Sequence, residues 1–145
     1  MIGHGIRQAI AEGLTLGVKA GVETEKLWEC VRRGSVGRMN GLHEGLARSV
    51  FKGKFDPPSF ALELARKDIG LATELGREFN VPLAVANLAE QIAIQGLNRG
   101  WGSLDNSITF LLQEEMADVE VRARDVDPEK AGKFITTHPE LDDLG

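Results

Sequence analysis

Two adjacent residues of opposite charge, Lys67 and Asp68, stand in a stretch that is otherwise rich in apolar residues. Neighbouring side chains on an α-helix project about 100° apart, so these two do not pair with each other and are free to face a partner. A lysine ammonium that faces a ligand supplies positive charge and hydrogen bonds to oxygen atoms. The alternative is an ordinary exposed ion pair with Arg66, Glu63 or Glu74.

Three further residues have types that suit a binding site or the protein core. Phe60 lies at the start of the same segment, where it either lines a substrate pocket or packs into the core as a hydrophobic staple. Asp105 is predicted to cap a helix, accepting from the backbone N–H of Ser107 or Ile108. Trp101, between two glycines, either fills the core or meets another subunit.

Metal binding and nucleophilic catalysis have no support in the sequence. The three histidines, His4, His43 and His138, are scattered, and no His, Cys or carboxylate cluster has the spacing of metal ligands. Neither Cys30 nor any serine has an identifiable base partner. The charged pair in the apolar stretch is therefore the strongest candidate for chemistry.

Size and composition indicate one globular domain. The chain has 145 residues, of which 42% are hydrophobic, enough for a single packed core. Twenty-two acidic and 17 basic residues give a net charge of −5, which argues against nucleic acid or an anionic membrane as the partner. The single cysteine, Cys30, favours a reducing, cytoplasmic location. No apolar run approaches the roughly 18 residues of a membrane-spanning helix.

Apolar residues recur every three or four positions along most of the chain, which predicts an all-α bundle of about six helices. Strand signals are weak, because β-branched residues do not alternate with polar ones. The expected helices cover residues 2–20, 24–33, 35–52, 59–79, 82–97 and 105–121. We expect residues 1–124 to form the domain and the acidic residues 125–145 to form a partly disordered tail.

Polar residues stand at most of the expected helix starts. Thr24, Ser35, Ser59 and Asp105 are the predicted N-caps, and Pro82 is predicted in the first turn of its helix. The helix after Pro82 is apolar on nearly every side, which predicts a central position in the bundle.

Two motifs, with a Val-Pro helix break between them, make most of the chain resemble the C-terminal helical domain of the β-hydroxyacid dehydrogenase family, which includes 3-hydroxyisobutyrate dehydrogenases. The first consists of Phe60, Lys67, Asp68, Leu71 and Ala72. The second is a glycine-punctuated turn that consists of Gly100, Gly102, Asp105 and Ser107. The 6-phosphogluconate dehydrogenases share this ancestry but have a much larger helical domain. The short length of this chain therefore favours the 3-hydroxyisobutyrate dehydrogenases.

The resemblance also implies what accompanies such a domain. Family members carry a Rossmann domain ahead of it and a Lys-x-x-Asn motif whose lysine is the general acid/base. Aligning the family pattern on Ala11–Leu14 and Lys19–Gly21 places that motif upstream of Met1, so we expect this chain to lack both parts. Hydride transfer needs a held dinucleotide and a nearby base, and the domain alone is therefore expected to be inactive.

By the same resemblance, Lys67 reaches the nicotinamide end of NAD or NADP, Asp68 helps to order the site, and Phe60 lines the substrate pocket. The expected function is the cofactor, substrate and dimerisation domain of an NAD(P)-dependent 3-hydroxyacid dehydrogenase. A homodimer is expected, and the Rossmann half could come from a separate chain. The alternative is a non-catalytic helical interaction module derived from that family.

Overall fold

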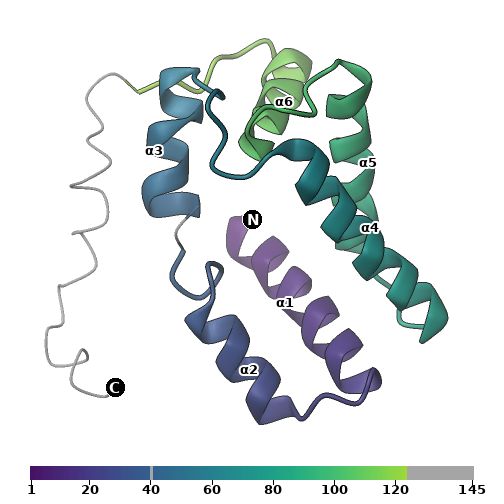
Figure 1. Cartoon of the computed structure of the whole chain (residues 1–145). Helices are drawn as coiled ribbons and strands as arrows, with labels where there is room; N and C mark the ends of the chain where they lie inside the picture. Colours follow the sequence, from purple (N-terminus) through teal and green to yellow (C-terminus); the bar gives the residue numbers. More distant parts are fainter. Residues whose placement is uncertain (40, 124–145) are drawn as a thin grey trace, which may run out of the picture.

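The part of the chain that the computed structural model describes, residues 1–39 and 41–123, folds as the predicted all-α bundle (Figure 1). It contains no β-strand beyond an isolated bridge between Ala61 and Asp105. Its α-helices are α1 (Ile2–Lys19), α2 (Thr24–Arg33), α3 (Leu46–Arg48), α4 (Leu62–Glu78), α5 (Ala84–Asn98) and α6 (Phe110–Ala117). The predicted acidic tail, 125–145, lies outside the described residues.

Helices α4 and α5 form the central pair, and they pack closely where small residues meet large ones. Gly96 of α5 receives Leu62 of α4, since a Cβ at Gly96 would lie 2.6 Å from the Leu62 Cδ2 atom. This contact belongs to the main core cluster, which consists of Val50, Phe55, Leu62, Ala93 and Ile108. The helix after Pro82 contacts α4, α1 and the turn before α6, but it keeps an exposed side that includes Leu88, so it is less central than predicted.

Helices α1 and α2 form a hairpin at the lower side of the bundle in Figure 1. Gly17 of α1 allows Leu27 of α2 to approach closely. The hairpin is tied to α5 by the buried Glu12 of α1, whose carboxylate accepts hydrogen bonds from the backbone N–H groups of Val85 and Ala86. A polar contact from α1 therefore satisfies the start of α5, which has no side-chain cap of its own.

The helix predicted over 35–52 is wrong for its first part. Residues 35–39 form turns, and the helical segment after them mixes a π-helical turn (Gly41–Gly45), the short α3 and a 3₁₀ turn (Val50–Lys52). Glycine is a poor helix former, and this segment has one at Gly37, Gly41 and Gly45. Gly37 also packs against the backbone of Arg32, where a Cβ would clash. These glycines explain why regular helix does not persist here.

Several helix boundaries differ from the prediction. Helix α4 begins after Ala61, whose backbone is extended, so Ser59 is not its N-cap. Helix α5 begins at Ala84, so Pro82 lies just before its first turn, and α2 has Glu23 rather than Thr24 at the N-cap position. Helix α6 ends at Ala117, short of the predicted residue 121.

The predicted cap at Asp105 is confirmed. Its side chain accepts from the Ser107 backbone N–H at 3.0 Å and starts a 3₁₀ turn (Asn106–Thr109) that leads into α6. Among the described residues, no helix combines the length and the apolarity that crossing a membrane requires.

Candidate functional site

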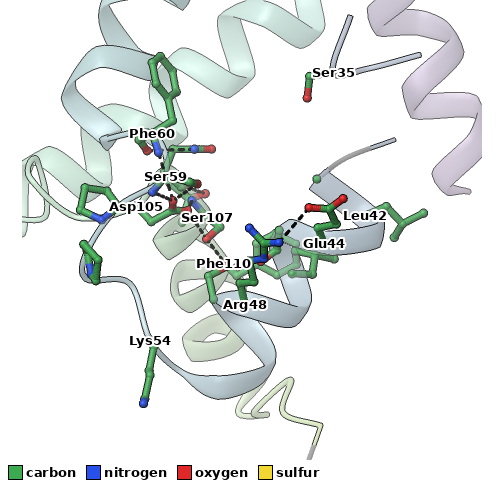
Figure 2. Close-up of a pocket in the computed structure, with 18 residues that line it drawn as sticks. Ser35, Leu42, Glu44, Arg48, Lys54, Ser59, Phe60, Asp105, Ser107 and Phe110 are labelled. Atoms are coloured by element: carbon green, nitrogen blue, oxygen red, sulfur yellow. Dashed lines mark hydrogen bonds and ion pairs between the residues drawn. The ribbon is translucent and has the colours of Figure 1, made fainter. Parts of the chain in front are cut away.

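A cleft of about 1030 Å³ opens beside the start of α4. One side is the segment from Gly41 to Ser49, which contains the π-helical turn and α3, and the other is the extended loop Pro57–Phe60. The residues from Asp105 to Phe110 join the two sides. Figure 2 shows Ser59 and Phe60 on one side and Leu42, Glu44 and Arg48 on the other, with Asp105 and Ser107 between them.

Asp105 holds the loop that carries Phe60. Its Oδ2 atom accepts from the Ser59 hydroxyl at 2.6 Å, from the Ser59 backbone N–H at 2.9 Å and, more weakly, from the Phe60 N–H at 3.4 Å. The backbone N–H and the side-chain Nδ2 of Asn106 donate to the Phe60 carbonyl at 2.8 and 3.1 Å. Phe60 is thus fixed by its backbone while its ring lines the cleft, 41% exposed.

The other oxygen of Asp105 reaches toward the opposite side of the cleft. Its Oδ1 atom accepts from the Ser107 N–H at 3.0 Å and from the Ser107 hydroxyl at 2.6 Å. The Ser107 hydroxyl lies 2.8 Å from that of Ser49, which in turn lies 2.8 Å from the carbonyl oxygen of Gly45. A continuous chain of polar contacts therefore runs from the Phe60 loop to the π-helical turn.

The hydrogen bonds keep Asp105 ionised. Burial by itself raises the pKa of this carboxyl group, but the donors on Ser107 and Ser59 outweigh burial and lower the pKa from 3.8 to about 2. Asp105 forms no ion pair with a described residue, so neutral N–H and O–H donors stabilise its charge. The negative charge is therefore committed to the protein and is not available as a base at neutral pH.

Charged groups at the rim of the cleft are few. Arg48 pairs with Glu44 across 3.2 Å on the same helical segment, and both side chains are largely exposed. Lys54 belongs to the lining, but Figure 2 shows its side chain pointing away from the labelled polar cluster. Apolar contacts come from Leu42, Phe60 and Phe110. The cleft thus offers hydroxyl, amide and apolar surface rather than a fixed cation.

Lys67 and Asp68 do not line this cleft. They lie on the exposed side of α4, and neither forms an ion pair or a side-chain hydrogen bond with a described residue. Their neighbour Arg66 instead pairs with Glu90 of α5 at 3.1 Å. The alternative interpretation expected both charges to be exposed, as they are, but the ion pair with Arg66, Glu63 or Glu74 is not formed among the described residues.

Lys67 is accompanied by exposed apolar side chains. Leu64 and Leu71 are both more than one-third exposed, and their spacing places them along the side of α4 that carries Lys67. Phe60, which is also more than one-third exposed, lies in the loop before α4. An unpaired ammonium beside apolar side chains suits a ligand that has both oxygen acceptors and a flat ring.

Sequence reasoning identified Phe60 and Asp105 as candidates but missed how they are connected. Ser59 appeared as a helix cap, whereas its hydroxyl donates to Asp105, which is 46 positions away. Ser49 gave no signal at all. In the part of the chain that the structure describes, no three His, Cys, Asp or Glu residues are grouped as metal ligands would be.

Comparisons with known proteins agree with this picture. Residues 1–112 match the family described as the NAD-binding domain of NADP-dependent 3-hydroxyisobutyrate dehydrogenase. The chain is 37% identical to 2-(hydroxymethyl)glutarate dehydrogenase of Eubacterium barkeri over 113 residues, which cover 78% of this chain and 37% of that protein. It is 33% identical to glyoxylate/succinic semialdehyde reductase 1 of Arabidopsis thaliana over 107 residues, which cover 74% and 36%.

A third relative has a different kind of name. The cytokine-like nuclear factor N-PAC of Aedes aegypti is 29% identical over 111 residues, which cover 77% of this chain and 19% of that protein. The chain thus corresponds to about a third, or less, of the length of these relatives.

Proposed function

Because this chain belongs to the family of NAD-binding domains of NADP-dependent 3-hydroxyisobutyrate dehydrogenases, we propose that it forms the helical half of a site for NAD or NADP and a small hydroxyacid. The observation that carries the proposal is the exposed, unpaired Lys67–Asp68 pair on α4, beside the loop that presents Phe60. The Lys67 ammonium and the Asp68 carboxylate are thus both available to a ligand of complementary charge.

Each of the three residues has a role in this proposal. The Lys67 ammonium donates to oxygen atoms at the nicotinamide end of the cofactor, and Asp68 orders that end of the site. The Phe60 ring excludes water from the side on which the hydroxyacid lies. When bound, NAD or NADP supplies the hydride chemistry of the alcohol–carbonyl conversion.

The substrate class follows from the names of the relatives. One is named for 2-(hydroxymethyl)glutarate and another for glyoxylate and succinic semialdehyde, and each of these small molecules carries both a carboxylate and an alcohol or aldehyde group. We propose a substrate of this class, a small hydroxyacid or its aldehyde form. The hydroxyl, amide and apolar lining of the cleft accommodates such a molecule.

We further propose that these 145 residues do not turn over substrate unaided. The sequence contains no Gly-x-Gly-x-x-Gly turn after a strand and no Lys-x-x-Asn motif where the family has its acid/base lysine. Activity then requires a Rossmann domain, whether it is joined to this domain or supplied as a separate chain.

The test supplies that half. A Rossmann domain with the Lys-x-x-Asn segment, taken from a family member, is joined ahead of this domain or mixed with it, and NAD(P)H absorbance is followed with 2-(hydroxymethyl)glutarate and with succinic semialdehyde. We expect turnover in the combined protein only. Lys67→Gln should lower kcat/KM by roughly tenfold to a hundredfold, because a charged hydrogen bond is lost.

The matched control is Lys19→Gln, which removes another exposed helical lysine far from the cleft. It should leave kcat/KM within about twofold of the unsubstituted protein. Absence of turnover in a combined protein that binds NADH would refute the proposal. So would equal effects of the two lysine substitutions.

Self-association is the second part of the proposed function. The apolar side chain of Leu88 on α5 is 61% exposed, which supports packing of this face against a second copy. We propose a homodimer that buries Leu88. Light scattering should give twice the mass of the chain, and Leu88→Glu should give the single-chain mass with unchanged helicity.

A non-catalytic interaction module is the second candidate function. Exposed apolar side chains on the α1–α2 hairpin, among them Ile2, Val18 and Trp28, support it, as does a relative that is named as a nuclear factor. Calorimetric titration with NAD and NADP separates the candidates. Binding that is weakened by Lys67→Gln favours the dehydrogenase half-site, and its absence at millimolar cofactor favours the module.

A further inference from the structure

Asp105 hydrogen-bonds to the Phe60 loop on one side of the cleft and to Ser107, whose hydroxyl lies 2.8 Å from that of Ser49 on the other side. No other described side chain hydrogen-bonds to both the Phe60 loop and the turn before α6. We infer that Asp105 is a positioning residue, whose carboxylate sets the distance between Phe60 and the π-helical side and thereby shapes the substrate pocket. This inference rests on the proposed function only for the identity of the ligand. The positioning itself concerns the free domain and is tested there.

The first step of the argument is that Asp105 does more than cap a helix. An N-cap needs one acceptor for the backbone N–H two or three residues later, and the 3.0 Å bond from the Ser107 N–H meets that need. The three contacts from Ser59 and Phe60 to Oδ2 are additional, and they come from a loop 45 to 46 positions away. They hold the cleft side that carries Phe60.

The second step concerns the opposite side. The π-helical turn Gly41–Gly45 is an uncommon conformation, of the kind that often occurs at functional sites. Its last carbonyl, on Gly45, lies within hydrogen-bond distance of the Ser49 hydroxyl, which lies 2.8 Å from the Ser107 hydroxyl. Ser49 donates its proton to the Gly45 carbonyl, and the single proton of the Ser107 hydroxyl lies between two acceptors, the Asp105 carboxylate and the Ser49 oxygen. The carboxylate thus orients the hydroxyl that meets the π-helical side.

The third step is that only a carboxylate meets all of these demands. Both of its oxygens accept, each from more than one donor, and the group is 6% exposed. An amide at this position would present an NH₂ group to one set of N–H donors and would leave them unsatisfied. The low pKa of Asp105 agrees with this, since the donors hold the ionised form. Asp105→Asn therefore preserves the size of the side chain and removes the connection.

The experiment is amide hydrogen exchange by NMR on the 145-residue chain. In Asp105→Asn we expect the amides of Ser59, Phe60 and Ser107 to exchange at least about tenfold faster. The amides of Val81 and Trp101, which donate to backbone carbonyls remote from this carboxylate, should change by less than about threefold. A uniform increase at all five amides, or no increase at the first three, would overturn the inference.

The matched control is Asp118→Asn. Asp118 is an exposed aspartate at a left-handed position, φ 51°, which asparagine accepts equally well. Asp118→Asn should leave the exchange rates of these five amides unchanged. If Asp105→Asn does not fold, Ser107→Ala removes the hydroxyl that faces Ser49 and Ser59→Ala removes one contact of the other side. Ser107→Ala should speed amide exchange on the π-helical side of the cleft only, and Ser59→Ala should speed it on the Phe60 side only. Faster exchange on both sides in both variants would contradict the inference.

A double-mutant cycle in the combined enzyme then tests positioning against plain stability. Asp105→Asn should raise KM for the hydroxyacid about tenfold with a smaller change in kcat. When Phe60→Ala is already present, Asp105→Asn should have little further effect on KM, because the side chain that Asp105 positions has been removed. Additive effects would overturn the inference. If the combined enzyme shows no turnover at all, the proposed function fails, while the exchange result still decides whether Asp105 positions the cleft.

Discussion

Glu12 offers the sharpest test of how the bundle is assembled. Its carboxylate on α1 accepts from the Val85 N–H at 2.9 and 3.1 Å and from the Ala86 N–H at 3.1 Å. These are among the N–H groups at the start of α5 that have no partner within their own helix. Helix α5 has no side-chain cap and no acidic residue in its first turn, so Glu12 performs both functions from another helix.

The magnitude follows from those contacts. Glu12→Ala leaves two buried N–H groups without their charged acceptor, and loss of a helix N-cap costs about 1–2 kcal/mol. Loss of the charge at the positive end of the helix adds about 0.5–1 kcal/mol. We therefore expect Glu12→Ala to lower the free energy of unfolding by about 1.5–3 kcal/mol. Glu12→Gln keeps one acceptor oxygen and should cost about 1–2 kcal/mol.

The assay is urea unfolding at pH 7, followed by circular dichroism, with a thermal melt as a second measurement. For a chain of this size the Ala variant should melt roughly 6–12 °C lower. Glu74→Gln is the control, because it removes the same charge from an exposed position on α4. A loss of less than about 0.5 kcal/mol for Glu12→Ala, or equal losses for Glu12→Gln and Glu74→Gln, would refute the reasoning.

The stability of the protein at acid pH provides a second test of the Glu12 contact. Burial raises the pKa of Glu12, but the N–H groups of Val85 and Ala86 outweigh burial and lower it below its ordinary value of 4.5. The group therefore stabilises the fold above about pH 4.5, and this contribution is lost as the pH falls through the lower pKa of the folded state. The Glu12→Gln variant should show a weaker loss of stability over that range.

Two further substitutions test other contacts. Gly76→Ala should lower the free energy of unfolding by about 1–3 kcal/mol, because a Cβ at this buried position would lie 2.9 Å from the Leu83 Cγ atom. Gly13→Ala, whose Cβ meets no atom within 4 Å, should instead raise it by about 0.5–1 kcal/mol, and urea unfolding measures both. The hydrogen bonds that lower the pKa of Asp105 to about 2 contribute roughly 2 kcal/mol to the free energy of unfolding. This contribution is present above about pH 4 and is lost as the pH falls toward 2. The difference in stability between the unsubstituted protein and Asp105→Asn should shrink by that amount over this range, and a constant difference would contradict the assigned hydrogen bonds.

The sequence alone was sufficient to predict the helices and the family. Apolar residues at a spacing of three to four positions predicted α1, α4 and α5 nearly to their ends, because helix periodicity is a local property. The Asp105–Ser107 spacing predicted a cap for the same reason, since both partners lie in one turn. The motif around Lys67 and Asp68 indicated the family to which the chain belongs.

Only the tertiary structure decided how these parts are connected. Ser59 donates to Asp105 and Glu12 accepts from Val85, contacts that span 46 and 73 positions and leave no periodic signal in the sequence. The predicted helix before the cleft also failed, because a glycine such as Gly37 permits a close backbone approach that only the folded chain brings about. Long-range hydrogen bonds form where packing places donor and acceptor together, and neither residue type nor local spacing specifies that partner.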